Sequence, residues 1–272
     1  MPGPIVCVPR TLPPDRHDAA VRRAVEINPA NGVQHRSVLR TPTGRLGGRA
    51  RLAIVIGRRW PVKGVRLTVS FMDGPPADLR TKILGHMNAW GKTANVAFAF
   101  TRGTGKVRIA RLDSPPDMSG YWSWIGTEIL EIPDDEPTLN LEGFTMRTPD
   151  SEFYRVVRHE SGHTLGFEHE HMRRALIARI DRAKAYRYFD RTQGWSREET
   201  DQQVLTPLES ASLMGTRVSD PHSIMCYQIP GSITKDGRPI AGGTDINKRD
   251  YAFAAAMYPK KVRAPRPRSK RR

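Results

Sequence analysis

The 272-residue sequence predicts an α+β domain, with a mixed sheet in its N-terminal half and a helical subdomain after it. Apolar residues alternate with polar or small ones over 64–72, which is typical of a strand. A helix pattern and two further strand patterns follow before a histidine-rich run at 159–169. A chain of this length can bury a substantial core, as one domain or as one domain with appendages.

The elements before the histidine-rich run follow from local patterns. Residues 1–59 predict a Pro/Arg-rich leader or pro-segment with one short helix at about 15–27. The first strand presents four apolar residues at alternating positions: Val65, Leu67, Val69 and Phe71. A helix is then predicted near 77–94, with an apolar stripe formed by Leu79, Ile83, Met87 and Trp90. Two more strands are expected at 96–100 and 107–112.

The most informative segment is the run H-E-S-G-H-T-L-G-F-E-H, which has the spacing H-E-x-x-H-x-x-G-x-x-H. His159 and His163 are four residues apart, so a helix places both imidazoles on one face, one turn apart. Gly166 is expected to end this helix, because glycine tolerates the left-handed conformation of a C-terminal cap. The chain can then turn back and bring His169 to the same point, whereas a continued helix would leave it on roughly the opposite face.

The residues before the run support a helix there. Thr148 is the predicted N-cap, Pro149 suits the first helical position, and Asp150 and Glu152 favour the positive end of the helix dipole. Three apolar residues precede the histidines at helical spacing: Phe153, Val156 and Val157.

Three neutral histidines with a fourth position left open are typical of a catalytic zinc site rather than a closed structural one. Zinc lowers the pKa of its bound water to about 7 and polarises a substrate carbonyl. Glu160 is the natural general base, which takes a proton from the water and passes it to the leaving amine. The chemistry implied is hydrolysis of a peptide bond. The alternative is an accidental match, which the added Gly and third His make roughly several hundred-fold rarer than for H-E-x-x-H alone.

A second motif lies downstream at Ser223-Ile224-Met225-Cys226-Tyr227, where Met225 can supply a soft, apolar floor under the histidines. The two motifs in this order resemble the metzincins, in which a Met-turn follows the histidine run. The sequence Gly166-Phe167-Glu168-His169-Glu170-His171, with Arg173 after it, narrows the resemblance to the astacin-like branch. The resemblance implies a zincin/metzincin fold, one catalytic Zn²⁺ held by His159, His163 and His169, and a peptide or protein substrate.

The resemblance also implies roles for individual residues. Tyr227 matches a fifth, switchable zinc ligand that hydrogen-bonds the oxyanion of the tetrahedral intermediate. Its alternative is a core aromatic with a satisfied hydroxyl. Glu170 matches a glutamate that is buried beside the site and pairs with the amino terminus of the processed enzyme, and His171 is expected to be structural. The segment 138–144 matches the edge strand that pairs with an extended substrate, although a purely structural edge strand fits as well.

Cysteine content separates this chain from most of the family it resembles. Astacins are usually secreted and disulfide-bonded, whereas this chain has two cysteines, Cys7 and Cys226. No inhibitory aspartate motif of the astacin type is recognisable near the N-terminus. A cysteine-poor, bacterial-type relative fits best. Cys7 is either a fourth zinc ligand that blocks the catalytic position, since a thiolate binds zinc, or a free and incidental cysteine.

The remaining segments carry weaker signals. The aromatic stretch at 121–126 is expected either near the cleft or in the core. After the histidines, helices are predicted near 175–189, 197–205 and 207–213, and a helix at 247–257 closes the domain. Five arginines between 173 and 187 either favour acidic substrates or form a solvated face.

The net charge of +16 is concentrated at the two ends of the chain. Residues 1–60 hold 11 arginines against 3 acidic residues, and residues 260–272 hold 8 basic residues and no acidic one. Residues 61–259 are neutral, with 25 basic and 25 acidic residues. We therefore predict a leader at 1–59, a catalytic domain at 60–259 and a basic, disordered tail at 260–272. The tail is either merely solvated or a weak contact for an anionic partner.

Two other functions compete with a zinc endopeptidase. One is a catalytically latent, zinc-bound scaffold used for binding, and the other is a binder of nucleic acid or anionic surfaces through the basic ends. The complete set of catalytic residues argues against the first, and the neutral centre argues against the second. No stretch is long and apolar enough to span a membrane, and the first ten residues lack a signal-peptide pattern. Cytoplasmic residence is the default expectation, with export by another route left open, and a monomer is expected.

Overall fold

A single mixed sheet forms the N-terminal half of the domain. The computed structural model describes residues 7, 10, 12–32, 57–112, 119–207 and 219–260. Within these ranges the sheet has the strand order β2-β1-β3-β5-β4. Its parallel strands are β1 (Val65–Phe71), β2 (Val96–Phe100), β3 (Val107–Ala110) and β5 (Leu139–Leu141). The antiparallel strand β4 (Tyr121–Ser123) ends the sheet beside β5. The α+β class and the mixed sheet are confirmed.

The prediction that 138–144 is the edge strand is wrong. Strand β5 pairs with β3 on one side and with β4 on the other, and its three residues are buried. The edge strand on this side of the sheet is instead β4, from the aromatic stretch at 121–126, in which Trp122 and Trp124 are also buried in the core. Local pattern did not distinguish the two strands, because the number of neighbours a strand has is decided by tertiary pairing.

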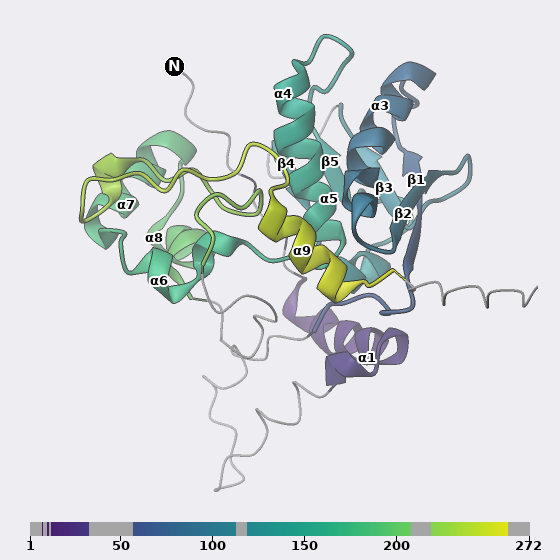
Figure 1. Ribbon diagram of the computed structural model, residues 1–272, viewed down its shortest axis with the longest axis horizontal. Helices are drawn as coiled ribbons and strands as arrows, with labels where there is room; N and C mark the ends of the chain where they lie inside the picture. The colour runs from purple at the N-terminus through teal and green to yellow at the C-terminus, as the bar shows by residue number, and fades with distance from the viewer. Residues whose placement is uncertain are drawn as a thin grey trace, which may run out of the picture.

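Helices cover the sheet and carry the histidines. Helix α3 (Ala77–Met87) and its continuation η3 (Asn88–Lys92) bury the predicted apolar stripe. Beside α3 lies one continuous helix made of α4 (Asp150–Glu152), a π-helical turn η6 (Phe153–Val157) and α5 (Arg158–Thr164). Figure 1 shows this long helix at the centre of the molecule, between the sheet and the helical lobe. Single π turns inside helices are frequent at functional sites.

The start of the histidine-bearing helix differs by one residue from the prediction. Pro149 occupies the N-cap position, with φ −56° and ψ 145°, and no side chain caps the helix. The Thr148 hydroxyl accepts a hydrogen bond from the Thr145 amide instead, at 3.0 Å. The residue before a proline is disfavoured in helical conformation, which keeps Thr148 in the preceding turn.

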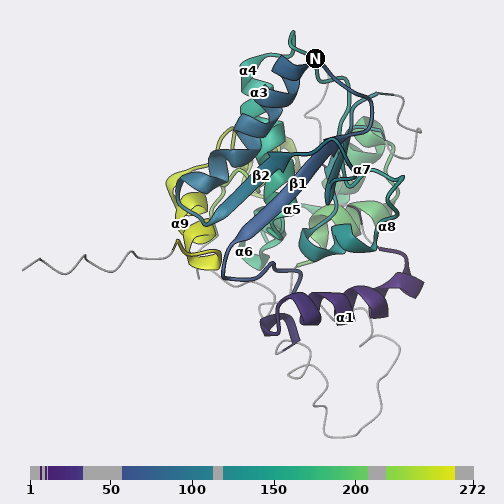
Figure 2. The ribbon, with the colours of Figure 1, turned by 90° about the vertical axis from the view of Figure 1, so that its right-hand side faces the viewer.

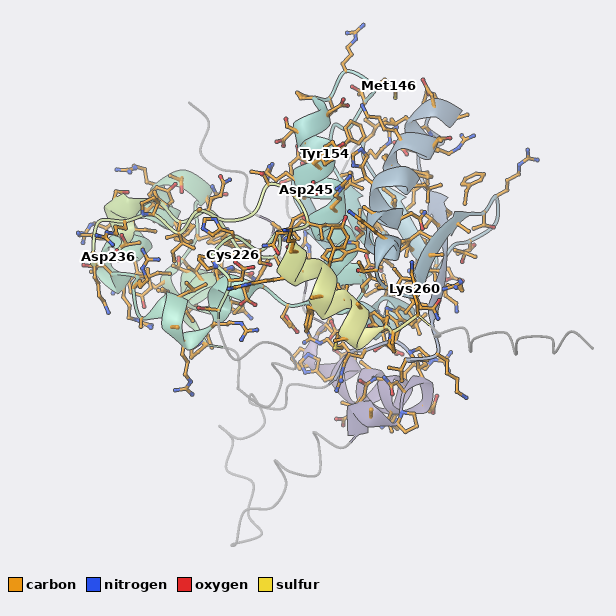
Figure 3. The ribbon with its side chains drawn as sticks, viewed as in Figure 1. Met146, Tyr154, Cys226, Asp236, Asp245 and Lys260 are labelled. Atoms are coloured by element: carbon orange, nitrogen blue, oxygen red, sulfur yellow. The ribbon has the colours of Figure 1, made fainter. Side chains whose placement is uncertain are left out.

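A helical lobe follows the histidine run. It contains η7 (Glu170–Met172), α6 (Arg174–Ile177), α7 (Arg182–Gln193), α8 (Arg197–Thr200), the π turn η8 (Asp201–Leu205) and η9 (Gly231–Ile233). The helix predicted at 175–189 is divided, because Asp181 caps a new helix by accepting from the Lys184 amide at 3.0 Å. The predicted helix at 207–213 lies almost wholly outside the described residues. In Figure 3, Asp236 marks the outer edge of this lobe and Cys226 its inner side.

The last helix of the described residues is α9 (Lys248–Met257), which confirms the helix predicted at 247–257. Asn247 and Asp250 form a reciprocal capping box at its start. Figure 1 shows α9 lying across the molecule, and α9 contacts η3. Residues 261–272, most of the predicted tail, lie outside the described residues. No helix in the described part of the chain is long and apolar enough to cross a membrane.

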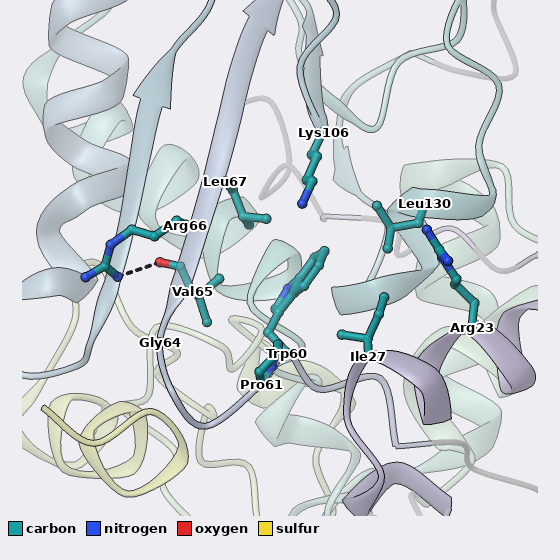
Figure 4. Close-up of a pocket in the computed structure, with 10 residues that line it drawn as sticks. All are labelled: Arg23, Ile27, Trp60, Pro61, Gly64, Val65, Arg66, Leu67, Lys106 and Leu130. Carbon is teal, nitrogen blue, oxygen red and sulfur yellow. Dashed lines mark hydrogen bonds between the residues drawn. The ribbon is translucent and has the colours of Figure 1, made fainter. Parts of the chain in front are cut away.

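Part of the predicted leader packs against the domain. Its short turn η1 (Pro14–Arg16) and helix α1 (His17–Ile27) match the helix predicted at 15–27, and α1 contacts η5 (Gly126–Glu131). Figure 2 shows α1 beneath the sheet, near the start of β1. A cavity of about 320 Å³ lies at this seam and is lined by Ile27, Trp60 and Lys106 among others (Figure 4). None of its lining residues belongs to the histidine run.

Candidate active site

The three histidines of the run converge on one point. Their Nε2 atoms lie 3.0 Å apart for His159 and His163, 3.0 Å for His163 and His169, and 3.1 Å for His159 and His169. All three side chains are buried. The first two come from successive turns of α5, and the third comes from the segment that follows the helix. The predicted convergence of two helical histidines with a third beyond Gly166 is therefore present.

The turn at Gly166 brings the third histidine back. Its φ of +91° is in the left-handed region that favours glycine. The Phe167 amide donates to the Gly162 carbonyl at 3.0 Å, and the Gly166 amide donates to the His163 carbonyl at 2.8 Å. This pair of bonds is a Schellman motif, which satisfies the last carbonyls of the helix while reversing the chain.

Hydrogen bonds set the tautomers of two of these imidazoles. The Nδ1 atom of His159 lies 2.6 Å from the Ile224 carbonyl oxygen, and that of His163 lies 2.7 Å from the Phe167 carbonyl oxygen. Since a carbonyl only accepts, both Nδ1 atoms must carry the proton, which leaves each Nε2 with a free lone pair. Burial lowers the pKa of His159 to about 4, and burial also holds the pKa of His163 and His169 well below the usual value.

This donor set fits a metal ion. The Nε2 lone pairs of neutral His159 and His163 face each other at 3.0 Å with no proton to share, so a cation between them relieves the repulsion. Three imidazole nitrogens suit zinc and leave a fourth position for another ligand. The sulfur of Cys7 belongs to the same group of ligand atoms, which all lie within 4.8 Å of one another.

Glu160 and Cys7 meet beside the histidines. The Cys7 thiol donates a hydrogen bond to Oε2 of Glu160 at 3.2 Å. Burial raises the pKa of Glu160 to about 8, and burial also raises the pKa of the Cys7 thiol. A residue from the leader therefore lies against both the metal-binding group and the predicted general base. Both cysteines are free, and both are buried.

Tyr227 packs against the histidines with an unsatisfied hydroxyl. Its ring stacks on His171, with centroids 4.0 Å apart, and its centroid lies 4.3 Å from that of His169. Its buried hydroxyl has no hydrogen-bond partner among the described residues. His171 donates from Nε2 to the Gln203 carbonyl at 3.0 Å and accepts from the Tyr227 amide at 3.4 Å. His171 thus holds the tyrosine backbone, whereas the tyrosine hydroxyl remains available.

Met225 lies directly under the helix that carries the first two histidines. A Cβ on Gly162 would be 2.6 Å from the Met225 sulfur, so the glycine makes room for it. The Met225 carbonyl accepts from the Glu170 amide at 2.8 Å, which joins the turn at 223–227 to the segment after His169. The location predicted for Met225, beneath the histidines, agrees with this packing.

Glu170 lies close to the histidines, where its partner is an arginine of the same segment. Its Oε1 pairs with Nε of Arg173 at 2.5 Å and accepts from the Asp220 amide at 2.9 Å. Burial raises the pKa of this carboxyl. The resemblance implies that this carboxylate pairs with a processed amino terminus. In this structure Arg173 is already in contact with it.

Sequence reasoning missed two residues that support the site. Arg58, which the prediction assigned to the leader, pairs with Glu128 at 2.9 Å and with Glu168 at 3.2 Å. Its carbonyl oxygen would be 3.1 Å from a Cβ on Gly166. Asp250 bonds the turn at 223–227. For Arg58, the available signal was Glu168, an acidic residue in a histidine run that contains no lysine or arginine. For Asp250, it was the capping pattern Asn247-x-x-Asp250.

The helix, the three imidazoles, the adjacent glutamate and the methionine beneath them define a metzincin-type zinc site. No family model matches the chain. The zinc metalloproteinase nas-27 of Caenorhabditis elegans is 26% identical over 213 residues, which cover 77% of this chain and 42% of nas-27. The chain thus spans less than half the length of that curated relative.

Two solved structures of myroilysin are each 30% identical and cover 75% of this chain. Their TM-scores are 0.69 and 0.56, with 97% and 86% of the myroilysin chain covered. The chain therefore belongs to the astacin-like metzincins, a family of zinc metalloproteases. The cofactor of this family is a catalytic zinc ion, and His159, His163 and His169 form the group that can bind it.

Replacing Gly166 by Ala tests the turn. The alanine backbone would have to adopt the left-handed conformation, and its Cβ would crowd the Arg58 carbonyl. We therefore expect a loss of about 1–3 kcal/mol in stability and weaker zinc binding. Gly74→Ala is the matched control, because Gly74 also has positive φ but an added Cβ meets nothing within 4 Å. Urea unfolding and chelator competition measure both effects. Equal zinc affinity in the two variants would contradict the role given to Gly166.

Proposed function

We propose that this protein is a zinc-dependent endopeptidase in which His159, His163 and His169 hold the metal and Glu160 is the general base. The observation that carries this proposal is the convergence of three Nε2 atoms within 3.1 Å of one another, next to a buried carboxylate. Zinc held there supplies Lewis acidity to a water and to the substrate carbonyl. The carboxylate of Glu160 accepts the proton of the attacking water and delivers it to the leaving amine.

Tyr227 is proposed to stabilise the transition state. Its hydroxyl is buried and lacks a partner among the described residues, yet its ring is held against His169 and His171. A buried hydroxyl without a hydrogen-bond partner costs free energy. The hydroxyl gains a partner when an oxyanion forms within reach. Donation from this hydroxyl to the tetrahedral intermediate would therefore be stronger in the transition state than in the ground state.

Strand β4 is proposed to align the substrate. It is the antiparallel edge of the sheet, and α5 contacts it directly. An extended peptide can add to such an edge through main-chain hydrogen bonds, which would place one of its peptide bonds beside the histidines. The substrate is accordingly a peptide or protein in extended conformation.

Cys7 is proposed to keep the full chain latent. Its sulfur lies within the ligand group formed with the three histidines. Its thiol also donates a hydrogen bond to the Glu160 carboxyl group. As a thiolate it would fill the fourth zinc position and exclude the water. The packing of α1 against η5 supports a leader that binds the domain in this state.

Several predictions from sequence stay predictions. They are the division at 59 and 260, the anionic partner of the basic tail, the monomeric state and residence in the cytoplasm. The comparisons favour a protease over a latent scaffold or a nucleic-acid binder.

Glu160→Gln tests the general base. In a Cys7→Ser background, the change should reduce kcat/KM on a peptide library by about 10²–10⁴-fold, because proton transfer is lost while the histidines remain. Zinc content, measured by metal analysis, should be unchanged. Glu198→Gln, on the exposed surface of α8, is the control and should retain activity. Activity within a few fold of the parent would refute the assignment.

Tyr227→Phe tests the oxyanion partner. We expect kcat to fall by about 10²–10³-fold, the effect of losing one oxyanion donor, with little change in KM. Stability should be preserved, since the removed hydroxyl has no partner among the described residues. Tyr258→Phe provides the contrast, because that hydroxyl donates to the Leu165 carbonyl at 2.6 Å and its loss should lower stability. An unchanged kcat would leave Tyr227 as a core aromatic.

Cys7→Ser tests latency. The full chain carrying this change should cleave peptides more than about tenfold faster than the parent, because a hydroxyl is a poor substitute for a zinc-bound thiolate. Cys226→Ala is the control, since Cys226 is outside the ligand group. If basal cleavage is the same in both, Cys7 is an incidental cysteine.

A further inference from the structure

We infer that Asp250 is a positioning residue for the zinc ligand His159, acting through both peptide groups that flank Ile224. This inference rests on the proposed zinc site and adds a residue from the other end of the domain. Asp250 lies at the start of α9, 91 positions after His159 in the sequence, and its side chain is 7% exposed. Among the described residues its hydrogen-bond partners are Ser223, Ile224 and Asn247, so its influence on the metal is indirect.

The peptide group between Ile224 and Met225 is fixed at both ends. Its carbonyl oxygen accepts from Nδ1 of His159 at 2.6 Å. Its amide donates to Oγ of Ser223 at 3.1 Å, and that hydroxyl donates its own proton to Oδ1 of Asp250 at 2.6 Å. A continuous chain of hydrogen bonds thus joins the carboxylate to the imidazole.

The preceding peptide group is held by the same carboxylate. Oδ2 of Asp250 accepts from the Ile224 amide at 3.0 Å and from the Asn247 amide at 3.0 Å. A carboxylate can accept at both oxygens in this arrangement, whereas an amide side chain would present a donor at one of them. The orientation of the Ile224 carbonyl is consequently fixed from both sides.

A second contact ties the start of α9 to the same helix turn. Asp245 lies beside the histidine-bearing helix, as Figure 3 shows, and its Oδ1 pairs with Nη1 of Arg158 at 2.5 Å. Arg158 immediately precedes His159 in the sequence. The segment from 245 to 250 therefore contacts both the helix that carries His159 and the turn that accepts its proton.

His159 needs this distant anchor more than His163 does. The acceptor for His163 is the Phe167 carbonyl, four residues away in the same Schellman turn. The acceptor for His159 comes from 65 residues further along the chain, in a turn that has no regular secondary structure of its own. Acceptors of this kind orient a ligating imidazole and raise its basicity, and losing one typically costs 10–100-fold in metal affinity or activity.

The test compares the zinc dissociation constants of full-length wild type and Asp250→Ala, measured by competition with a chromogenic chelator. We expect the dissociation constant to rise by about 10–100-fold, with an altered visible spectrum of the cobalt-substituted protein. Asp181→Ala is the matched control. It removes an aspartate that caps α7, so it should cost about 1 kcal/mol in stability without changing zinc affinity.

Two further variants keep the inference testable if Asp250→Ala does not fold. Ser223→Ala breaks only the hydroxyl arm, and Asp250→Asn keeps the shape while converting one acceptor into a donor. We expect each to weaken zinc binding by a smaller factor, on the order of tenfold or less. Wild-type zinc affinity in every folded variant would overturn the inference. A Cys7→Ser chain that binds zinc but cleaves no peptide would instead refute the proposed endopeptidase, and the affinity comparison would still decide the role of Asp250.

Discussion

The whole site depends on holding three uncharged imidazoles with their lone pairs directed at one point. Between His159 and His163 this arrangement is repulsive without a cation, because both rings carry their proton on Nδ1 and their Nε2 lone pairs face each other at 3.0 Å. The protein maintains this arrangement in two ways. It buries the rings, which disfavours their charged form, and backbone carbonyls accept hydrogen bonds from the Nδ1–H groups of His159 and His163. The free energy of this preorganisation is supplied by the folded domain and is recovered when the metal binds.

Three separate parts of the fold meet that constraint. The α5 helix spaces the first two histidines, the Gly166 turn returns the third, and the turn at 223–227 closes the site from beneath. The last of these has the least local structure, and it is held by side chains rather than by a helix or sheet ladder. Its attachment to α9 explains why a helix far along the chain belongs to the active-site architecture.

The N-terminal segment contributes one residue to the same site. Cys7 lies within reach of the metal position and of Glu160, so the groups needed for hydrolysis are the ones it covers. Arg58 supports the structure of the site instead of contacting the metal-binding group. It pairs with Glu168 of the histidine run, and its carbonyl packs against the Gly166 turn. Arg58 thus supports the site from within the segment that the sequence assigns to the leader.

The sequence by itself determined the chemistry of the site and most of the regular elements. The spacing of His159, Glu160, His163, Gly166 and His169 is short-range, so helix geometry and glycine conformation are enough to interpret it. The same holds for α1, α3, α9 and strands β1 to β3, whose patterns are local. Only the tertiary structure decided that β4 rather than β5 is an edge strand, that Cys7 lies at the histidines and that Asp250 bonds the turn whose carbonyl accepts from His159. Each of these depends on contacts between residues far apart in the chain, which no local spacing encodes.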